Sequence, residues 1–496
     1  KARSGGHTPL LAACREGHAE VAQLLCEQGA DKERVALHGW TPFLLAARHG
    51  HTSVSKVLQE AGAHQPRTLP DGTSAMHMAS ERGNEELAAF LVSSGAEVDK
   101  PRADGVTALH LAAEAGHVEV VSVLCEARAD ITCKTDDTLM PLHLAARSGH
   151  RAAAERLCEM GAPMNATTVD GLAPLHFAAC NGHTEVLTFL CKAGADTEQA
   201  IDGNATPLIV AAYKGDVAVI ELLCRMKADV NRTQSDHASP LFVAAENAHA
   251  EGARVMQALL EAGAFQDQAT QSGRTPLLAA VRNGRLDLVQ TLCSFRADLN
   301  KAAENGWSPL LLAAQRGYTE VVKCLCDSNA CLDILMKDGS SALHLAARTG
   351  FRDVAEALLE ARADVDQRRL DGSSPAHAAA HGGHLEVLRL LCELGADTAA
   401  LNFEGHTAQE VAQMLDHEQC ASCLRDASRT AYLHRDDGIG GGRATPVCNV
   451  NLVEIVMLAL FPFVVVVLSM LLAAAISQKQ LAAQRLQEMI HTLVGP

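Results

Sequence analysis

The sequence predicts an all-α solenoid of stacked short helices followed by one apolar C-terminal segment. Three observations carry this prediction. A residue pattern recurs through most of the 496-residue chain, chiefly at intervals of 33 residues, and an uncharged apolar run lies near the C-terminus. Hydrophobic residues make up 48% of the chain but aromatic residues only 3%, so Ala and Leu must form the core. A single conventional core stops growing at about 250–300 residues, whereas a stack of repeats has no such limit.

One equivalent position, here called the anchor, sets the register of the repeat. Eleven of the twelve intervals between successive anchors are 33 residues, and one is 36. Pro follows the anchor in nine of the thirteen units and Ala in the other four. The anchors are Thr8, Thr41, Ser74, Thr107, Met140, Ala173, Thr206, Ser239, Thr275, Ser308, Ser341, Ser374 and Thr407.

Each mark of the repeat has a physical reason. Thr or Ser followed by Pro is an N-cap followed by a first helical position, so a first helix is expected to start there. A Gly stands nine residues after the anchor in eleven of the first twelve units, where a left-handed residue can end that helix. A second helix with larger aliphatics follows, as in Val120, Val121 and Leu124. Because one unit cannot bury its own apolar face, stability must come from stacking neighbours.

These marks make a family resemblance visible. Residues 104–121 read DGVTALHLAAEAGHVEVV, which resembles the ankyrin consensus, and similar segments recur from Gly6 to about Ala400. The resemblance implies helix pairs with β-hairpin fingers, a concave face that binds proteins, a role as scaffold or adaptor, and no catalysis by the repeats. We expect the ankyrin-repeat domain with its C-terminal cap to occupy residues 1–425.

Two departures from the repeat are informative. The extra three residues between Ser239 and Thr275 fall around 248–255, which predicts a longer inter-helix turn. Such an insertion is either tolerated at the surface or a bend that divides the stack into two binding surfaces. The last unit carries polar Gln409, Glu410 and Gln413 where other units are apolar, which predicts a polar cap.

Cysteine and histidine recur at fixed repeat positions, and this argues against metal or redox chemistry. Stacked helices lie about 8–10 Å apart, too far for most disulfides, so the cysteines on the second helix are interpreted as reduced, small hydrophobes in a reducing compartment. They are Cys26, Cys125, Cys158, Cys191, Cys224, Cys293, Cys326 and Cys392. One histidine per repeat cannot converge on one zinc ion. The resemblance implies that His77, His110, His143, His176, His344 and His377 hold the finger to the helix.

Cations just before the turn glycine give the strongest binding signal. They would form a basic stripe on the face that the family uses for partners, and they fit an acidic peptide segment. The alternative is that cations simply complement the dipole at helix C-termini. The residues are Arg15, Arg48, Arg82, Arg147, Lys214, Arg282, Arg316 and Arg348. Trp40 and Trp307 both directly precede an anchor and are either contact residues for a partner or packing against the neighbouring finger.

Composition and motifs exclude several other functions. The formal net charge of -17 argues against binding to nucleic acid phosphates. We find no nucleotide-binding loop, kinase signature or catalytic constellation, so no enzymatic activity, cofactor, metal or small-molecule substrate is expected.

The C-terminal part predicts a membrane anchor. Residues 426–451 are rich in Gly and are expected to form a flexible linker, and 452–476 are expected to form one transmembrane helix. Its core, 455–476, is IVMLALFPFVVVVLSMLLAAAI without a charge, and about 20 apolar residues suffice to cross a bilayer. Residues 477–496 would form a short amphipathic tail.

Three functional hypotheses follow. The first is a single-pass, membrane-anchored scaffold or adaptor whose ankyrin repeats face the cytoplasm. The second is the N-terminal part of a truncated multi-span protein, of the channel or acyltransferase type, that its ankyrin domain regulates. The third is a soluble regulatory subunit whose apolar helix is buried by a partner.

Overall fold

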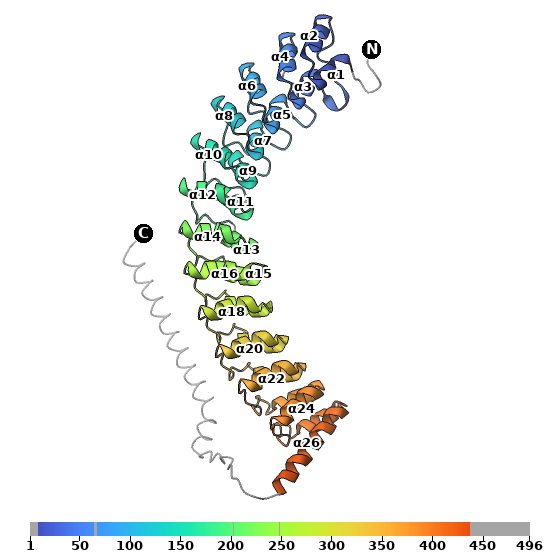
Figure 1. Ribbon diagram of the computed structural model, residues 1–496, viewed down its shortest axis with the longest axis vertical. Helices are drawn as coiled ribbons and strands as arrows, with labels where there is room; N and C mark the ends of the chain where they lie inside the picture. Colours follow the sequence, from blue (N-terminus) through green and yellow to red (C-terminus); the bar gives the residue numbers. More distant parts are fainter. Residues whose placement is uncertain (1–7, 64–66, 202, 248, 437–496) are drawn as a thin grey trace, which may run out of the picture. The chain divides into compact units, whose positions relative to one another are not determined.

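The computed structural model describes residues 8–63, 67–201, 203–247 and 249–436. The compact repeat unit ends at Arg429. Figure 1 shows the odd-numbered and even-numbered helices stacked in two parallel rows along this unit. The predicted helical solenoid is therefore confirmed for the described residues.

Each unit contains an inner helix that starts directly after the anchor. The inner helices are α1 (Pro9–Glu16), α3 (Pro42–His49), α5 (Ala75–Arg82), α7 (Ala108–Ala115), α9 (Pro141–Ser148), α11 (Pro174–Cys180), α13 (Pro207–Lys214), α15 (Pro240–Asn247), α17 (Pro276–Arg282), α19 (Pro309–Arg316), α21 (Ala342–Thr349), α23 (Pro375–Gly382) and α25 (Ala408–Met414).

An outer helix then runs back along each inner helix. The outer helices are α2 (Ala19–Glu27), α4 (Thr52–Glu60), α6 (Glu85–Ser93), α8 (Val118–Glu126), α10 (Arg151–Glu159), α12 (Thr184–Lys192), α14 (Val217–Arg225), α16 (Gly252–Glu261), α18 (Leu286–Ser294), α20 (Thr319–Asp327), α22 (Arg352–Glu360), α24 (Leu385–Glu393) and α26 (Glu418–Asp436). A short 3₁₀ turn, η1 (Leu37–Gly39), lies in the first finger.

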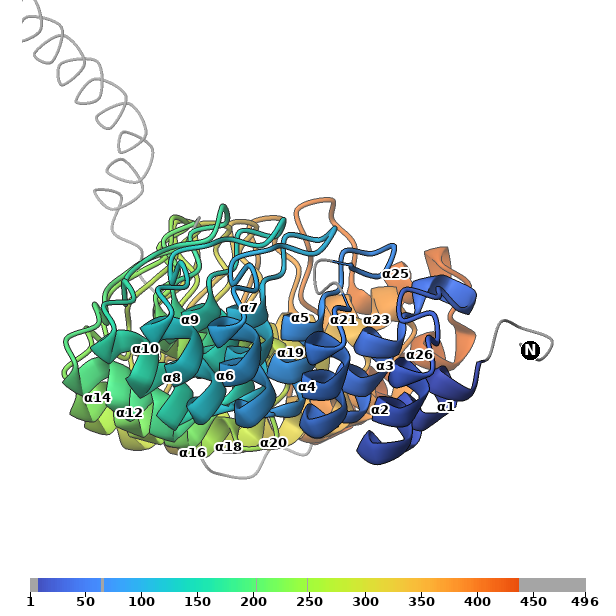
Figure 2. The ribbon, with the colours of Figure 1, turned by 90° about the horizontal axis from the view of Figure 1, so that it is seen from above.

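The fingers project together from one edge of the stack (Figure 2). They were expected to be β-hairpins, but no strand forms in the described residues, and Leu401 and Thr407 make one isolated bridge. Two backbone hydrogen bonds of a tight turn typically close a finger, as from Arg102 N to Val106 O at 2.9 Å and from Gly105 N to Arg102 O at 3.1 Å. A single backbone hydrogen bond joins successive fingers, as from Ala103 N to Asp71 O at 2.8 Å. The fingers are too short to build a ladder.

Alanine pairs bring neighbouring inner helices together. Ala112 and Ala113 of α7 have no exposed surface, and the same is true of Ala145 and Ala146 of α9. The outer helices contribute larger side chains, such as the fully buried Leu124. The result is one continuous apolar core from Leu10 to Leu424. Small residues on one row and larger ones on the other let every unit cover its neighbour.

The repeat histidines join each inner helix to the following finger, as the resemblance implied. In His110, Nδ1 accepts a hydrogen bond from Thr107 N at 3.1 Å, and Nε2 lies 3.0 Å from Leu139 O. Where the anchor lacks a hydroxyl the histidine still caps the helix, because Met140 N donates to His143 Nδ1 at 3.0 Å. These rings therefore connect units rather than bind a metal.

A second histidine position, which was not assigned a role from the sequence, also links units. The residue after the turn glycine reaches back to the preceding inner helix, as in His183, whose Nε2 lies 2.9 Å from Arg147 O. The ring packs on the turn glycine of that preceding unit: a Cβ on Gly116 would lie 2.4 Å from His150 Nδ1. Gly116 is thus required by its φ of 77° and by the neighbouring ring.

The insertion lengthens the turn without interrupting the stack. Helix α15 ends at Asn247 and α16 starts at Gly252, and α16 has 10 residues instead of the usual 9. Packing continues from α15 to α17 and from α16 to α18, and a Cβ on Gly252 would lie 3.1 Å from Leu288. The continuous core supports the interpretation as a tolerated surface insertion.

The C-terminal expectations need two corrections. Helix α26 continues to Asp436, so residues 426–436, expected to be linker, are helical; Gly first appears at 438, which explains why the helix can extend. The cap is not uniformly polar, because Met414 and Leu415 are exposed there. The predicted transmembrane helix at 452–476, the remaining linker and the tail at 477–496 lie outside the described residues. Within the described residues, no helix has the length and apolarity that crossing a bilayer requires.

All fifteen cysteines among the described residues are free thiols. Cys26 and Cys125 are buried as expected, whereas the other six of the outer-helix set are only partly buried. Burial still raises the pKa of Cys158, Cys191 and Cys224 to about 11, so these thiols stay protonated near neutral pH.

We expect acid to destabilise the repeats. Burial lowers the pKa of His77, His143, His176 and His344 from 6.5 to about 4, so these rings stay neutral in the folded state while the unfolded chain takes up protons. Each of these histidines contributes fully to the free energy of unfolding above pH 6.5. Its contribution decreases as the pH falls toward 4, and at pH 5 about 2 kcal/mol per histidine has been lost. Urea denaturation at pH 7, 6 and 5 measures this loss. His143→Gln should reduce the pH dependence, and an unchanged dependence contradicts the assignment.

Replacing Gly116 tests the ring contact between units. Gly95 is a matched control, because its φ is 78° but no atom lies within 4 Å of the place where a Cβ would stand. Gly95→Ala should cost about 1–2 kcal/mol from left-handed strain alone. Gly116→Ala should cost a further 1–3 kcal/mol or so, because the methyl group collides with His150. Equal losses in urea denaturation of the two variants would show that the contact is unimportant.

Candidate protein-binding surface

Cavities lined by inner helices and fingers lie beside Trp307 and beside Phe403, and the face of the stack formed by the inner helices and fingers is here called the inner groove. All eight predicted cations lie in the last turn of an inner helix. Seven are exposed and Arg147 is partly buried. Their position complements the helix dipole, so the dipole alone accounts for the stripe and cannot distinguish a binding role.

Carboxylates neutralise part of the stripe. Arg15 pairs with Glu16 at 2.8 Å, Arg147 pairs with Glu114 at 2.6 Å, and Arg282 pairs with Glu246. The other five cations form no ion pair with any carboxylate in the described residues. They are Arg48, Arg82, Lys214, Arg316 and Arg348. The stripe is therefore positive in separate places rather than along its whole length.

One of these places is a cavity of about 280 Å³ beside Trp307. The cavity brings together three residues of the predicted binding set, Arg282, Arg316 and Trp307, and it includes Arg274, Ala303 and Leu312. The side chains come from α17, α19 and the two fingers that precede these helices. The helix dipole accounts for Arg282 and Arg316, which lie at helix ends, but not for Arg274 and Trp307, which lie on the fingers.

The finger fixes Trp307. The backbone carbonyl of Trp307 accepts a hydrogen bond from Ala303 N at 3.0 Å, and the backbone N–H of Trp307 donates to Asn305 Oδ1 at 3.3 Å. The indole is partly buried and packs against the core while lining the cavity. An aromatic side chain held in this way loses little conformational entropy when it binds a partner.

Arg274 is held at the equivalent position of the preceding finger. Its guanidinium lies 5.2 Å from the Phe242 ring centroid and 3.4 Å from Glu246 Oε1. Glu246 also pairs with Arg282, so one carboxylate is shared by two guanidinium groups. The cavity lining itself contains no carboxylate, and the local charge is positive. Arg316 has no carboxylate partner in the part of the chain that the structure describes.

Trp40 occupies the same repeat position as Trp307 but is used differently. The Arg48 guanidinium stacks over the Trp40 ring at 4.7 Å from its centroid, a cation–π contact within the protein. The sequence left both tryptophans open to packing or binding. In the structure Trp40 is stacked against its own repeat, while Trp307 lines a cavity.

A second positive place surrounds His49 at the N-terminal end of the groove. Burial and then the positive charges of Arg82, His51, Arg48 and Arg15 lower the pKa of His49. Its ring stacks on His51 at a centroid distance of 6.2 Å. These groups gather positive charge, but the nearby aromatic ring of Trp40 is already covered by Arg48.

Arg274 and Phe242 were not predicted from the sequence, whereas Glu246 was recognised as a carboxylate at a position of the stripe. A signal was present, because Arg274 directly precedes an anchor, as Trp40 and Trp307 do. Their connection was not visible, since Glu246 and Arg282 are 36 residues apart and belong to successive units. Aligning the units position by position would have identified these residues as neighbours.

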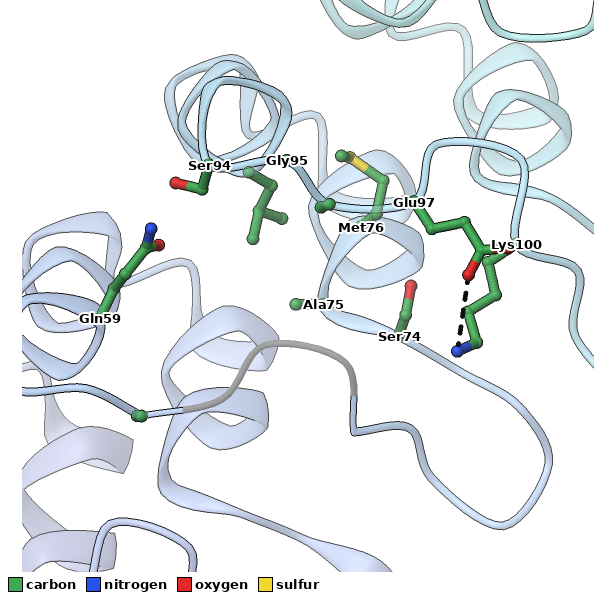
Figure 3. A pocket seen from close by; sticks show the side chains of 11 residues that line it. Gln59, Ser74, Ala75, Met76, Ser94, Gly95, Glu97 and Lys100 are labelled. Carbon is green, nitrogen blue, oxygen red and sulfur yellow. Dashed lines mark ion pairs between the residues drawn. The ribbon is translucent and has the colours of Figure 1, made fainter.

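Another cavity, of about 390 Å³, lies between the ends of α4 and α6 and the start of α5 (Figure 3). Its charged residues Glu97 and Lys100 pair with each other at 3.8 Å, and no aromatic side chain lines it. It offers neither a ring nor an unpaired charge to a ligand. Among the described residues, no three His, Cys, Asp or Glu side chains are grouped so as to hold a metal ion.

The stacked helix pairs and the inner groove define a helical-repeat protein whose surface suits protein partners. A family model for ankyrin repeats in three copies matches residues 1–68, 60–135, 128–201, 208–303 and 296–369. A model for ankyrin repeats in many copies matches residues 358–412. The chain therefore belongs to the ankyrin-repeat family, and its repeats imply protein partners. None of the curated proteins compared with the chain matches it.

Proposed function

We propose that the protein is a membrane-anchored ankyrin scaffold that binds an acidic peptide segment of a protein partner in the inner groove. The Trp307 cavity carries this proposal. Its lining combines the Trp307 ring with Arg316, which has no carboxylate partner among the described residues, and with Arg274 and Arg282, which share Glu246. Guanidinium groups pair well with carboxylates, and an indole provides a rigid apolar contact. The repeats themselves are assigned no catalytic role.

The membrane part of the proposal is supported by the sequence. Residues 455–476 form an uncharged apolar run of the length that a bilayer requires. A cytoplasmic location of the repeats is supported by the fifteen free thiols among the described residues, since reduced cysteines are typical of that compartment. In this proposal the repeats recruit the partner to the membrane.

Replacing Trp307 tests the peptide site. Trp307→Ala should weaken binding of a short, end-blocked peptide of alternating Glu and Gly by about tenfold or more, because the variant loses the rigid aromatic contact. Arg316→Gln should weaken it by severalfold and reduce the salt dependence of binding. Fluorescence anisotropy with the full chain measures both effects.

Matched controls make this test specific. Trp40→Ala replaces the same residue type at the same repeat position, and its effect should stay within about twofold because Arg48 already covers the ring. A peptide of alternating Gln and Gly should bind poorly. Equal binding of the two peptides, or an equal loss in both tryptophan variants, refutes an acidic-peptide site at Trp307.

The membrane proposal has an independent test. Cells expressing the full chain are fractionated, extracted with alkaline carbonate and treated with protease on intact membranes. The chain should resist extraction, and protease added from the cytoplasmic side should digest the repeats. Release by carbonate contradicts the anchor and makes 455–476 a partner-binding segment, whereas protected repeats contradict a cytoplasmic location.

A further inference from the structure

The C-terminal end of the inner groove contains a second cavity, of about 430 Å³. Helices α21, α23 and α25 and the last two fingers enclose it. Its lining includes Arg348, Arg369, His381, Phe403, Met414 and Leu415. The volume lies in the range of small-ligand and side-chain pockets, about 300–1,000 Å³. It shares no lining residue with the Trp307 cavity.

The last unit has apolar side chains at the groove positions that are basic in other units. Met414 and Leu415 stand at the two positions that hold the cations in eight other units. Phe403 is 78% exposed, Met414 65% and Leu415 42%. Exposed apolar side chains gathered at one cavity are a common mark of an interaction site. The predicted polar cap therefore applies to the outside of the last unit and not to its groove.

The backbone fixes Phe403 in this position. Its N–H donates to Asp371 O at 2.9 Å, which joins the last two fingers. The ring lies against Gly372: a Cβ there would be 2.7 Å from Phe403 Cδ1. A side chain that is already held over a glycine needs little ordering when a partner packs on it.

The cavity lining holds two guanidinium groups, those of Arg348 and Arg369, and two carboxylates, those of Asp371 and Glu404. Arg369 pairs with Asp338 at 2.7 Å and with Asp371 at 3.6 Å, and Glu404 lies 3.7 Å from His406. Arg348 is exposed and has no carboxylate partner in the described part of the chain. Arg348 is therefore the group of the lining that can pair with a negative charge next to an apolar group.

We propose that this cavity, here called the C-terminal cup, binds a short segment of a protein partner in which a large apolar side chain lies one or two residues from an Asp or Glu. The apolar side chain packs on Phe403, Met414 and Leu415, and the carboxylate pairs with Arg348. This goes beyond the acidic-peptide site at Trp307, because the cup selects an apolar residue and the other site selects charge.

A selection experiment tests the chemistry of the partner without assuming its identity. End-blocked random peptides are selected on the full chain and counter-selected on the Met414→Ser, Leu415→Ser double variant. The peptides that bind only the unmodified chain should share Phe, Leu, Met or Trp within one or two residues of Asp or Glu. A set without this apolar and acidic pairing overturns the proposal.

The affinities of the selected peptides then assign the contacts. Phe403→Ser should weaken binding by about tenfold or more, and Arg348→Gln by severalfold. Phe265→Ser is the matched control, since Phe265 is 63% exposed and lies outside the cup, and Arg225→Gln on outer helix α14 controls for loss of a cation. Neither control should change binding. All substituted side chains are exposed, and circular dichroism checks that the variants fold.

Two further measurements separate this proposal from others. Trp307→Ala should leave binding of these peptides unchanged, so failure of the cup and failure of the acidic-peptide site give different results. Light scattering compares the full chain with the Met414→Ser, Leu415→Ser variant. If the substitutions dissociate an oligomer and leave peptide binding intact, the occupant is a second copy of the chain and the proposal is wrong.

Discussion

The structure depends on the inability of a single repeat to bury its own apolar surface. The inner helices hold alanine pairs with no exposed surface, such as Ala112 and Ala113 of α7, and α7 packs against the inner helices of both neighbouring units. Two histidine positions reinforce this dependence, because His110 reaches the next finger and His183 reaches the preceding helix. Stability is consequently shared between units.

Local rules explain why the sequence predicted the stack so well. The hydroxyl N-cap, the turn glycine and the 33-residue interval each act within one unit or between neighbours, so they can be seen in sequence. The strandless fingers were missed because the resemblance implied hairpins, whereas the backbone hydrogen bonds of a finger are those of a tight turn, as from Arg102 N to Val106 O and from Gly105 N to Arg102 O. The longer α26 was missed because Gly438 to Gly442 dominated the interpretation of that region, although the residues before them can form a helix.

The binding candidates were predictable only in part. Sequence position identified Arg282, Arg316 and Trp307, but not that these three line one cavity. Sequence position could not show that Trp307 and Trp40 have different surroundings, because the stacking of Arg48 on Trp40 depends on side-chain conformations. The scaffold is the same in every unit, and only two or three groove positions per unit vary. The side chains at these positions distinguish the charged cavity at Trp307 from the more apolar C-terminal cup.

The central claim is that partners bind in the inner groove and not on the outer helices. Hydrogen–deuterium exchange of the full chain, with and without the alternating Glu and Gly peptide, tests it most directly. We expect slower exchange in α17, α19 and the finger at 303–307, with no change in outer helices α18 and α20. Protection confined to the outer helices, or none at saturating peptide, would contradict the claim.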